Sequence, residues 1–197
     1  MVGDLSEPLV LLVVGSAVLV LALDDWRPMV GGWALTAAAS GLLLQILAGV
    51  PVELAGLQML SGGLLAGVFY LVAWRAQRTA PSVLGARSIV PWRFRALAGF
   101  FLYLLARLLA ARFPLPFLPI PLLAMTYALI GIGLLMATLS RSPLKAGLGV
   151  LTMFSGYQVF YFAVQDSLIA IGLMAAMSLV VAFLMAALTL IRQERLP

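Results

Sequence analysis

Cysteine and histidine are both absent from this chain of 197 residues. Without histidine, the chain has no imidazole to ligate haem or a di-iron centre and no histidine base for a catalytic triad. Without cysteine, it has no thiolate for an iron–sulfur cluster, no disulfide and no cysteine nucleophile. Lys145 is the only lysine and follows a polar turn, whereas a retinal Schiff base needs a lysine in mid-membrane. We therefore expect no bound cofactor and no metal.

Charged residues are scarce as well, at 10% of the chain, while 64% of the residues are hydrophobic. A soluble domain carries roughly 25% charged residues, and the mean hydropathy here is +1.14. This composition predicts an integral membrane protein. The net charge of +5 is then typical of a basic cytoplasmic face, so we do not expect nucleic acid as a partner.

Long apolar runs predict an all-α bundle of about seven transmembrane helices, because a bilayer core requires about 20 mainly apolar residues per helix. Prolines, glycines and short polar turns separate the runs. Pro8 is expected in the first turn of the first helix, Pro143 in the first turn of the sixth, and Asp166 at the cap of the last. Residues 113–119 contain three prolines and are expected to be an extended connector. The predicted spans are residues 8–23, 29–50, 55–73, 96–111, 120–139, 144–164 and 167–191.

The longest polar stretch, residues 75–95, is basic and contains no acidic residue. Pro81 and Pro91 interrupt it, and within it residues 88–95 alternate apolar with basic side chains. This pattern predicts a short segment lying flat at the lipid headgroups. By the positive-inside rule, the basic groups lie in the cytoplasm, which places the N-terminus outside and the C-terminus inside the cell. The predicted cytoplasmic basic face comprises Arg75, Arg78, Arg87, Arg93, Arg95, Arg141 and Lys145.

Few polar side chains lie within the predicted spans. Arg107 is the one charge clearly inside a span, where it could contact a lipid headgroup or a carboxylate of a partner; alternatively, its long side chain reaches the interface. Gln158 and Tyr157 could form hydrogen bonds between helices or line a path for a quinone, a pigment or protons. With Arg112, these are the predicted lipid or partner contacts. The apolar centres of the other spans contain no titratable pair, so we do not expect an enzyme.

Small residues are frequent where helices would meet. Gly63 and Gly67 form a Gly-x-x-x-Gly step in the third span, and glycines recur in the fifth and sixth spans at Gly131, Gly133, Gly147, Gly149 and Gly156. Small residues let two helix backbones approach closely in lipid. The pattern therefore indicates helix packing, either within the chain or with a neighbouring subunit.

The C-terminal third resembles a known three-helix module. The run IGIGLLM at residues 130–136, the basic turn SRSPLK at 140–145 and the run GLGVLTM at 147–153 precede a last apolar helix. This arrangement is similar to the K-type subunit of respiratory complex I, the C subunit of Mrp antiporters and the C-terminal part of component E of hydrogenase-4 complexes. The first three spans, with DWRP at residues 25–28, more loosely resemble the J-type subunit of complex I.

The resemblance has a limit that concerns proton transfer. K-type subunits carry a glutamate in each of two helices, and these positions correspond here to Leu151 and to Met177 or Ser178. None of these side chains can relay a proton. The resemblance therefore implies the architecture and membership of a complex, and not the relay.

Together these observations predict a single membrane domain in three parts: a first three-helix unit at 8–75, a basic connector with a fourth helix at 76–119, and a K-type-like three-helix unit at 120–192. The expected function is a non-catalytic, multi-pass subunit of the cell inner membrane that scaffolds the larger subunits of a complex-I-like, hydrogenase-like or antiporter-like assembly. Its expected partners are other integral membrane subunits and lipids. The alternatives are an accessory subunit of another respiratory or photosynthetic complex, or a small independent transporter or lipid-handling protein.

Overall fold

The described part of the chain folds into seven helices without a strand, which confirms the predicted all-α class. The computed structural model describes residues 2–79, 90–116, 118–164 and 168–194. Arg87 of the predicted basic face and the predicted cap Asp166 lie outside these residues. The helices are α1 (Val2–Ala22), α2 (Trp26–Ala48), α3 (Val52–Thr79), α5 (Trp92–Arg112), α6 (Ile120–Leu139), α7 (Pro143–Val164) and α8 (Leu168–Glu194).

Six of these helices, α2 to α8, are long and apolar enough to cross a membrane, as expected of a multi-pass membrane protein. The apolar part of α1, Glu7–Ala22, is shorter than the other six spans. A bilayer core requires about 20 residues of helix; α1 has 21 residues in all, but its apolar part falls below this length. The seventh predicted crossing therefore depends on how α1 is placed against its neighbours.

Local sequence explains most helix ends. The ends of α6, at Ile120 and Leu139, are the predicted ones, and α7 begins at Pro143, whose missing N–H costs nothing in a first turn. The C-terminal cap of α2 is Gly49, with a φ of 64°. This left-handed conformation is accessible to glycine because it has no Cβ.

Four predicted helix starts are too late. Two of these helices, α2 and α3, begin at Trp26 and Val52, each three residues before the predicted span. The other two are α1 and α5. Pro8 was expected in a first turn but lies inside α1, which begins at Val2. Pro8 is exposed and lies in the second turn of the helix, where its ring removes one backbone hydrogen bond close to the helix end. In α5, Trp92 to Arg95 form the first turn of a long helix and not a flat segment. Pro91 precedes that turn, and the burial of Arg95 inside the bundle fixes the helix direction.

The third predicted span is too short. Instead of ending at residue 73, α3 continues to Thr79, so Arg75 and Arg78 extend it beyond its apolar part. Arginine has a high helix propensity, and a helix keeps its backbone hydrogen bonds as it leaves the membrane. The polar residues at this end are therefore helical.

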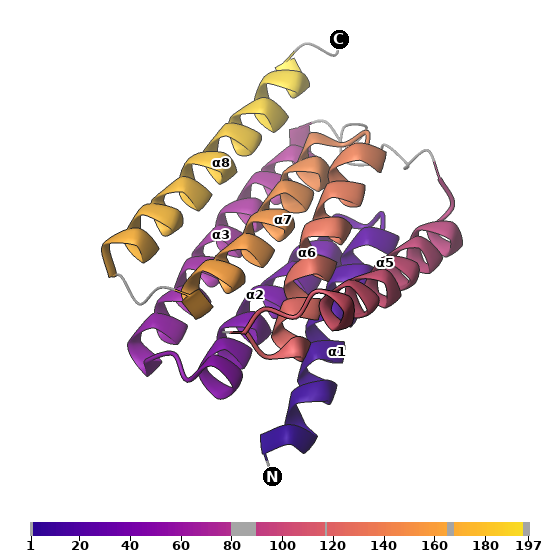
Figure 1. The fold of residues 1–197 in the computed structure, drawn as a ribbon. Coiled ribbons are helices and arrows are strands. Elements are labelled where there is room, and N and C mark those ends of the chain that lie inside the picture. The colour runs from indigo at the N-terminus through magenta and orange to yellow at the C-terminus, as the bar shows by residue number, and fades with distance from the viewer. Residues whose placement is uncertain (1, 80–89, 117, 165–167, 195–197) are drawn as a thin grey trace.

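The helices form two layers that lie face to face (Figure 1). In one layer α2 lies between α1 and α3, and in the other α7 lies between α6 and α8. Across the layers, α1 packs on α6, α2 on α7 and α3 on α8, while α5 covers α1 and α6 at one edge. The spans of α6 and α7 are 56% buried and that of α8 is 22% buried, so α6 and α7 are central and α8 is peripheral.

The tightest helix contact joins α6 and α7 through glycines. A Cβ built on Gly133 would lie 2.3 Å from the backbone nitrogen of Met153 and 2.6 Å from the carbonyl oxygen of Gly149. A Cβ on Gly149 would lie 2.6 Å from the backbone nitrogen of Ala137. Real Cβ atoms do not approach other heavy atoms so closely, so both positions require glycine.

Candidate functional site

A buried ionic cluster lies at the end of the bundle where α1 finishes and α5 and α7 begin, here called the Asp24 end. Arg95 Nη2 donates to Asp24 Oδ2 at 2.6 Å, and Lys145 Nζ donates to Asp24 Oδ1 at 3.2 Å. The Arg95 and Lys145 side chains are 1% and 5% exposed, whereas that of Asp24 is 39% exposed. One partly exposed carboxylate thus pairs with two buried cations.

The same two cations also bind the C-terminal carbonyls of α1. Arg95 Nη1 donates to the carbonyl oxygen of Leu21 at 2.9 Å, and Lys145 Nζ donates to that of Leu23. The last carbonyls of a helix have no partner within the helix and carry the negative end of its dipole. Cations from α5 and α7 therefore cap α1 and hold three helices together. Arg95 Nε is buried and forms no hydrogen bond within the described residues.

The structure divides the predicted basic face into two groups. Arg95 and Lys145 are buried in the cluster and are not available as a solvated face. Other members are exposed, and two of them stack on tryptophan: Arg78 lies 3.8 Å from the ring centre of Trp74, and Arg93 lies 5.7 Å from that of Trp92. Such pairs are typical of the membrane boundary. The exposed members are Arg75, Arg78, Arg93 and Arg141.

Arg107 lies at the opposite end of the bundle and pairs with Glu7. Its Nη1 and Nη2 atoms donate to the two carboxylate oxygens of Glu7 at 3.2 and 3.0 Å. Both side chains are about half exposed, at 51% and 47%. The pair joins α5 to α1 on the outer surface. The carboxylate that Arg107 contacts in the structure therefore belongs to this chain. Arg112, the last residue of α5, is exposed.

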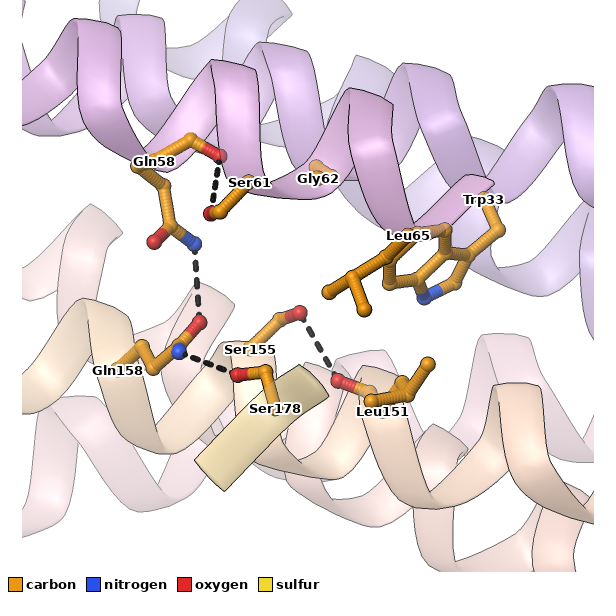
Figure 2. Close-up of a pocket in the computed structure, with 10 residues that line it drawn as sticks. Trp33, Gln58, Ser61, Gly62, Leu65, Leu151, Ser155, Gln158 and Ser178 are labelled. Carbon is orange, nitrogen blue, oxygen red and sulfur yellow. Dashed lines mark hydrogen bonds between the residues drawn. The ribbon is translucent and has the colours of Figure 1, made fainter. Parts of the chain in front are cut away.

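Gln158 belongs to a buried amide network that crosses between the two layers (Figure 2). Gln58 Nε2 of α3 donates to Gln158 Oε1 of α7 at 3.1 Å. Gln158 Nε2 donates to Ser178 Oγ of α8 at 2.9 Å, and Ser178 Oγ donates to the carbonyl oxygen of Met174. The network therefore connects three helices, α3, α7 and α8, in the interior of the bundle.

A small cavity adjoins this network. About 10 Å³ of it is open to the centre of a water molecule. Trp33 of α2 lies at one side of it; its indole is 2% exposed, and Nε1 forms no hydrogen bond within the described residues. The cavity is lined by Trp33, Ala37, Gln58, Ser61, Gly62, Leu65, Leu151, Ser155, Gln158 and Ser178.

Tyr157, which was predicted to act beside Gln158, points the other way. It is exposed and forms a row of rings with Phe154 and Tyr161 along the outer face of α7, with ring centres 6.4 Å apart in each pair. Adjacent residues of a helix project about 100° apart. The structure therefore separates an inward amide from an outward aromatic strip.

The sequence concealed three members of these sites. Asp24 lies in a stretch of sequence that reads as an ordinary polar turn, and only the folded chain brings Arg95 and Lys145 to it. Ser178 occupies a position where the resemblance led us to look for a glutamate, and it is a hydrogen-bonding residue instead. Trp33 had no signal beyond its hydrophobicity, because its unpartnered N–H results from the packing around it.

Comparisons with family models, curated proteins and solved structures gave no match for this chain. The function must therefore be argued from the arrangement itself. Among the described residues, no group of three or more acidic, histidine or cysteine side chains could hold a metal ion. The clusters present here can neutralise charge, cap helices and satisfy buried amides.

Proposed function

We propose that this chain is a non-catalytic membrane subunit that scaffolds larger subunits of a complex-I-like, hydrogenase-like or antiporter-like assembly. The observation that carries the proposal is the outer face of α3. Gly63 and Gly67 are exposed there, and a Cβ on either would have no neighbour within 4 Å. They lie in a shallow apolar groove lined by Met59, Leu60, Gly63, Leu64, Gly67, Val68 and Leu71.

The chain uses its other glycines differently. Gly133 and Gly149 allow α6 and α7 to pack closely, and Gly62 lies against Ala37 of α2. Helix association in lipid depends on such close approach. The Gly-x-x-x-Gly step on α3 offers the same geometry on a face that is exposed in the described part of the chain. A helix of another subunit is the occupant that this face fits best.

The proposed orientation follows from the charges. The Asp24 end carries most of the described basic side chains, including Arg75, Arg78 and Arg141, while Glu7 and Glu53 lie at the other end. The positive-inside rule then favours a cytoplasmic Asp24 end, an outside N-terminus and a cytoplasmic C-terminus. It also requires α1 to cross the membrane, and the bilayer concerned is the cell inner membrane.

A second candidate is a small independent transporter or lipid-handling protein, for which the cavity beside Gln158 is the relevant observation. The cavity lies between the two layers, where transporters built from parallel repeats place their substrates. Its 10 Å³ for a water-sized centre is too small for a lipid chain or an organic substrate. The size of the cavity therefore favours the scaffold.

The experiment that tests the proposal fills the groove on α3. We expect the double variant Gly63→Leu/Gly67→Leu to fold, because the added side chains meet no neighbour in the chain. A tagged wild-type chain, purified in mild detergent, should bring hydrogenase-like or antiporter-like membrane subunits with it, and the double variant should lose them. The matched control is Gly15→Leu/Gly31→Leu, whose positions are also exposed and open.

Three results would count against the scaffold. A wild-type chain recovered alone as a monodisperse monomer would contradict every subunit role. Equal loss of partners in the control would show that the α3 face is not specific. Proton or ion flux through liposomes that contain only this chain, abolished by changing one buried side chain, would favour the transporter.

A further inference from the structure

The cavity between the layers combines two features that a dry packing defect lacks. The first is its position among polar groups from four helices: Trp33 of α2, Ser61 of α3, Ser155 of α7 and Ser178 of α8 all line it. The second is the buried indole Nε1 of Trp33, which forms no hydrogen bond within the described residues. Buried polar groups in proteins are hydrogen-bonded to protein or to ordered water.

The serines at the cavity can accept hydrogen bonds. Ser61 Oγ donates its proton to the carbonyl oxygen of Gln58 at 3.0 Å, and Ser155 Oγ donates to that of Leu151 at 2.9 Å. Each hydroxyl oxygen has two lone pairs, so both remain acceptors while they donate. The lining thus presents a buried donor without a partner among the described residues, at Trp33, and at least two acceptors.

The size and charge of the cavity define the ligand. A space of about 10 Å³ for the centre of a water molecule matches one water, which needs roughly 10–15 Å³ by this measure and forms about three hydrogen bonds. No acidic or basic side chain lines the cavity, so a bare ion would have no counter-charge. An apolar ligand of similar size, such as a methyl group, would leave the indole N–H of Trp33 without a hydrogen-bond acceptor.

We propose that this cavity is a binding site for one water molecule, which accepts a hydrogen bond from Trp33 Nε1 and donates to acceptors of the lining on the Ser155 side. Together with the amide network, this water forms a polar contact between the two layers, because it connects α2 to α7. This inference goes beyond the scaffold role and does not depend on it.

The test observes the indole N–H directly. The chain contains four tryptophans, so ¹⁵N-indole labelling gives four signals, and the signal lost in Trp33→Phe identifies Trp33. In wild-type protein in detergent micelles, we expect a rotating-frame cross-peak between the Trp33 indole proton and water. Trp26, which donates to Gln77 Oε1 at 3.1 Å, serves as the internal reference for an indole bonded to protein.

Three variants identify the source of the cross-peak. Ser155→Val fills the cavity and should abolish it, whereas Ser155→Ala keeps the space and should retain it, which shows that the serine hydroxyl is not its origin. Ser40→Ala is the matched control, since Ser40 is a buried serine outside the cavity that donates to Ala37 O, and it should leave the cross-peak unchanged. The proposal is overturned by a wild-type spectrum without the cross-peak or by its persistence in Ser155→Val. The wild-type spectrum alone decides the matter if Ser155→Val does not fold.

Discussion

Replacing Asp24 with asparagine should destabilise the bundle strongly, although Asp24 is not itself buried. Asparagine keeps the shape of the side chain but removes the negative charge that faces Arg95 Nη2 at 2.6 Å and Lys145 Nζ at 3.2 Å. Both cations would stay buried without the Asp24 carboxylate, while their hydrogen bonds to carbonyls at the end of α1 remain. The variant therefore measures the cost of removing the negative charge that faces two buried cations.

The magnitude follows from the burial of each partner. Removing one member of a buried ion pair costs about 3–5 kcal/mol. Because Asp24 is 39% exposed, solvent screens part of this interaction, and we expect a loss of about 2–3 kcal/mol in the free energy of unfolding. For a chain of this size, such a loss lowers Tm by roughly 5–10 °C. Thermal unfolding in mild detergent, followed by tryptophan fluorescence, measures it.

The neighbouring residue Asp25 provides the matched control. It is exposed and lies at the N-cap of α2 without a side-chain cap hydrogen bond. Asparagine is as good an N-cap residue as aspartate, so Asp25→Asn should change the stability by less than about 0.5 kcal/mol. In an Arg95→Met background, the effect of Asp24→Asn should shrink, because one of the two cations is gone. The reasoning is refuted if Asp24→Asn unfolds at the same temperature as Asp25→Asn.

Two further predictions concern packing and orientation. Gly133→Ala should cost about 1–3 kcal/mol of stability or prevent folding, because its Cβ would meet the α7 backbone. Gly131→Ala should be tolerated, because its Cβ meets only a flexible leucine side chain at 3.3 Å. Equal unfolding temperatures for the two variants would contradict this prediction. Because the chain has no cysteine, single-cysteine variants can report the orientation. In intact cells, Arg141→Cys should resist a membrane-impermeant maleimide and Glu53→Cys should react with it. The reverse pattern would contradict the proposed orientation.

The membrane character and most helices of this protein could be predicted from composition and local sequence. Whether a segment inserts into a bilayer depends largely on the transfer free energies of its residues, and whether it forms a helix depends largely on their backbone preferences. Both properties are set by the residues themselves and their near neighbours. This is why the ends of α6 and the start of α7 at Pro143 follow from the residues at those positions.

Predictions from local sequence failed where a distant residue supplied the stabilising contact. Arg95 has the sequence context of a basic surface segment, but Asp24 and the end of α1, 71 or more residues away in the chain, draw it into the bundle. The first turn of α5 is helical in part because this burial fixes it. No local pattern around Trp92 to Arg95 contains that information.

The sequence by itself determined that the chain is all-helical, apolar and rich in close-packing glycines. Only the tertiary structure decided which face of each helix is used: Gln158 inward and Tyr157 outward, Gly133 against α7 and Gly63 on the open face of α3. Glycines on buried and on exposed helix faces look alike in the sequence, so the sequence pattern alone does not distinguish them. The difference arises because a side chain's neighbours are set by the shapes of other helices, and those helices are distant in the chain.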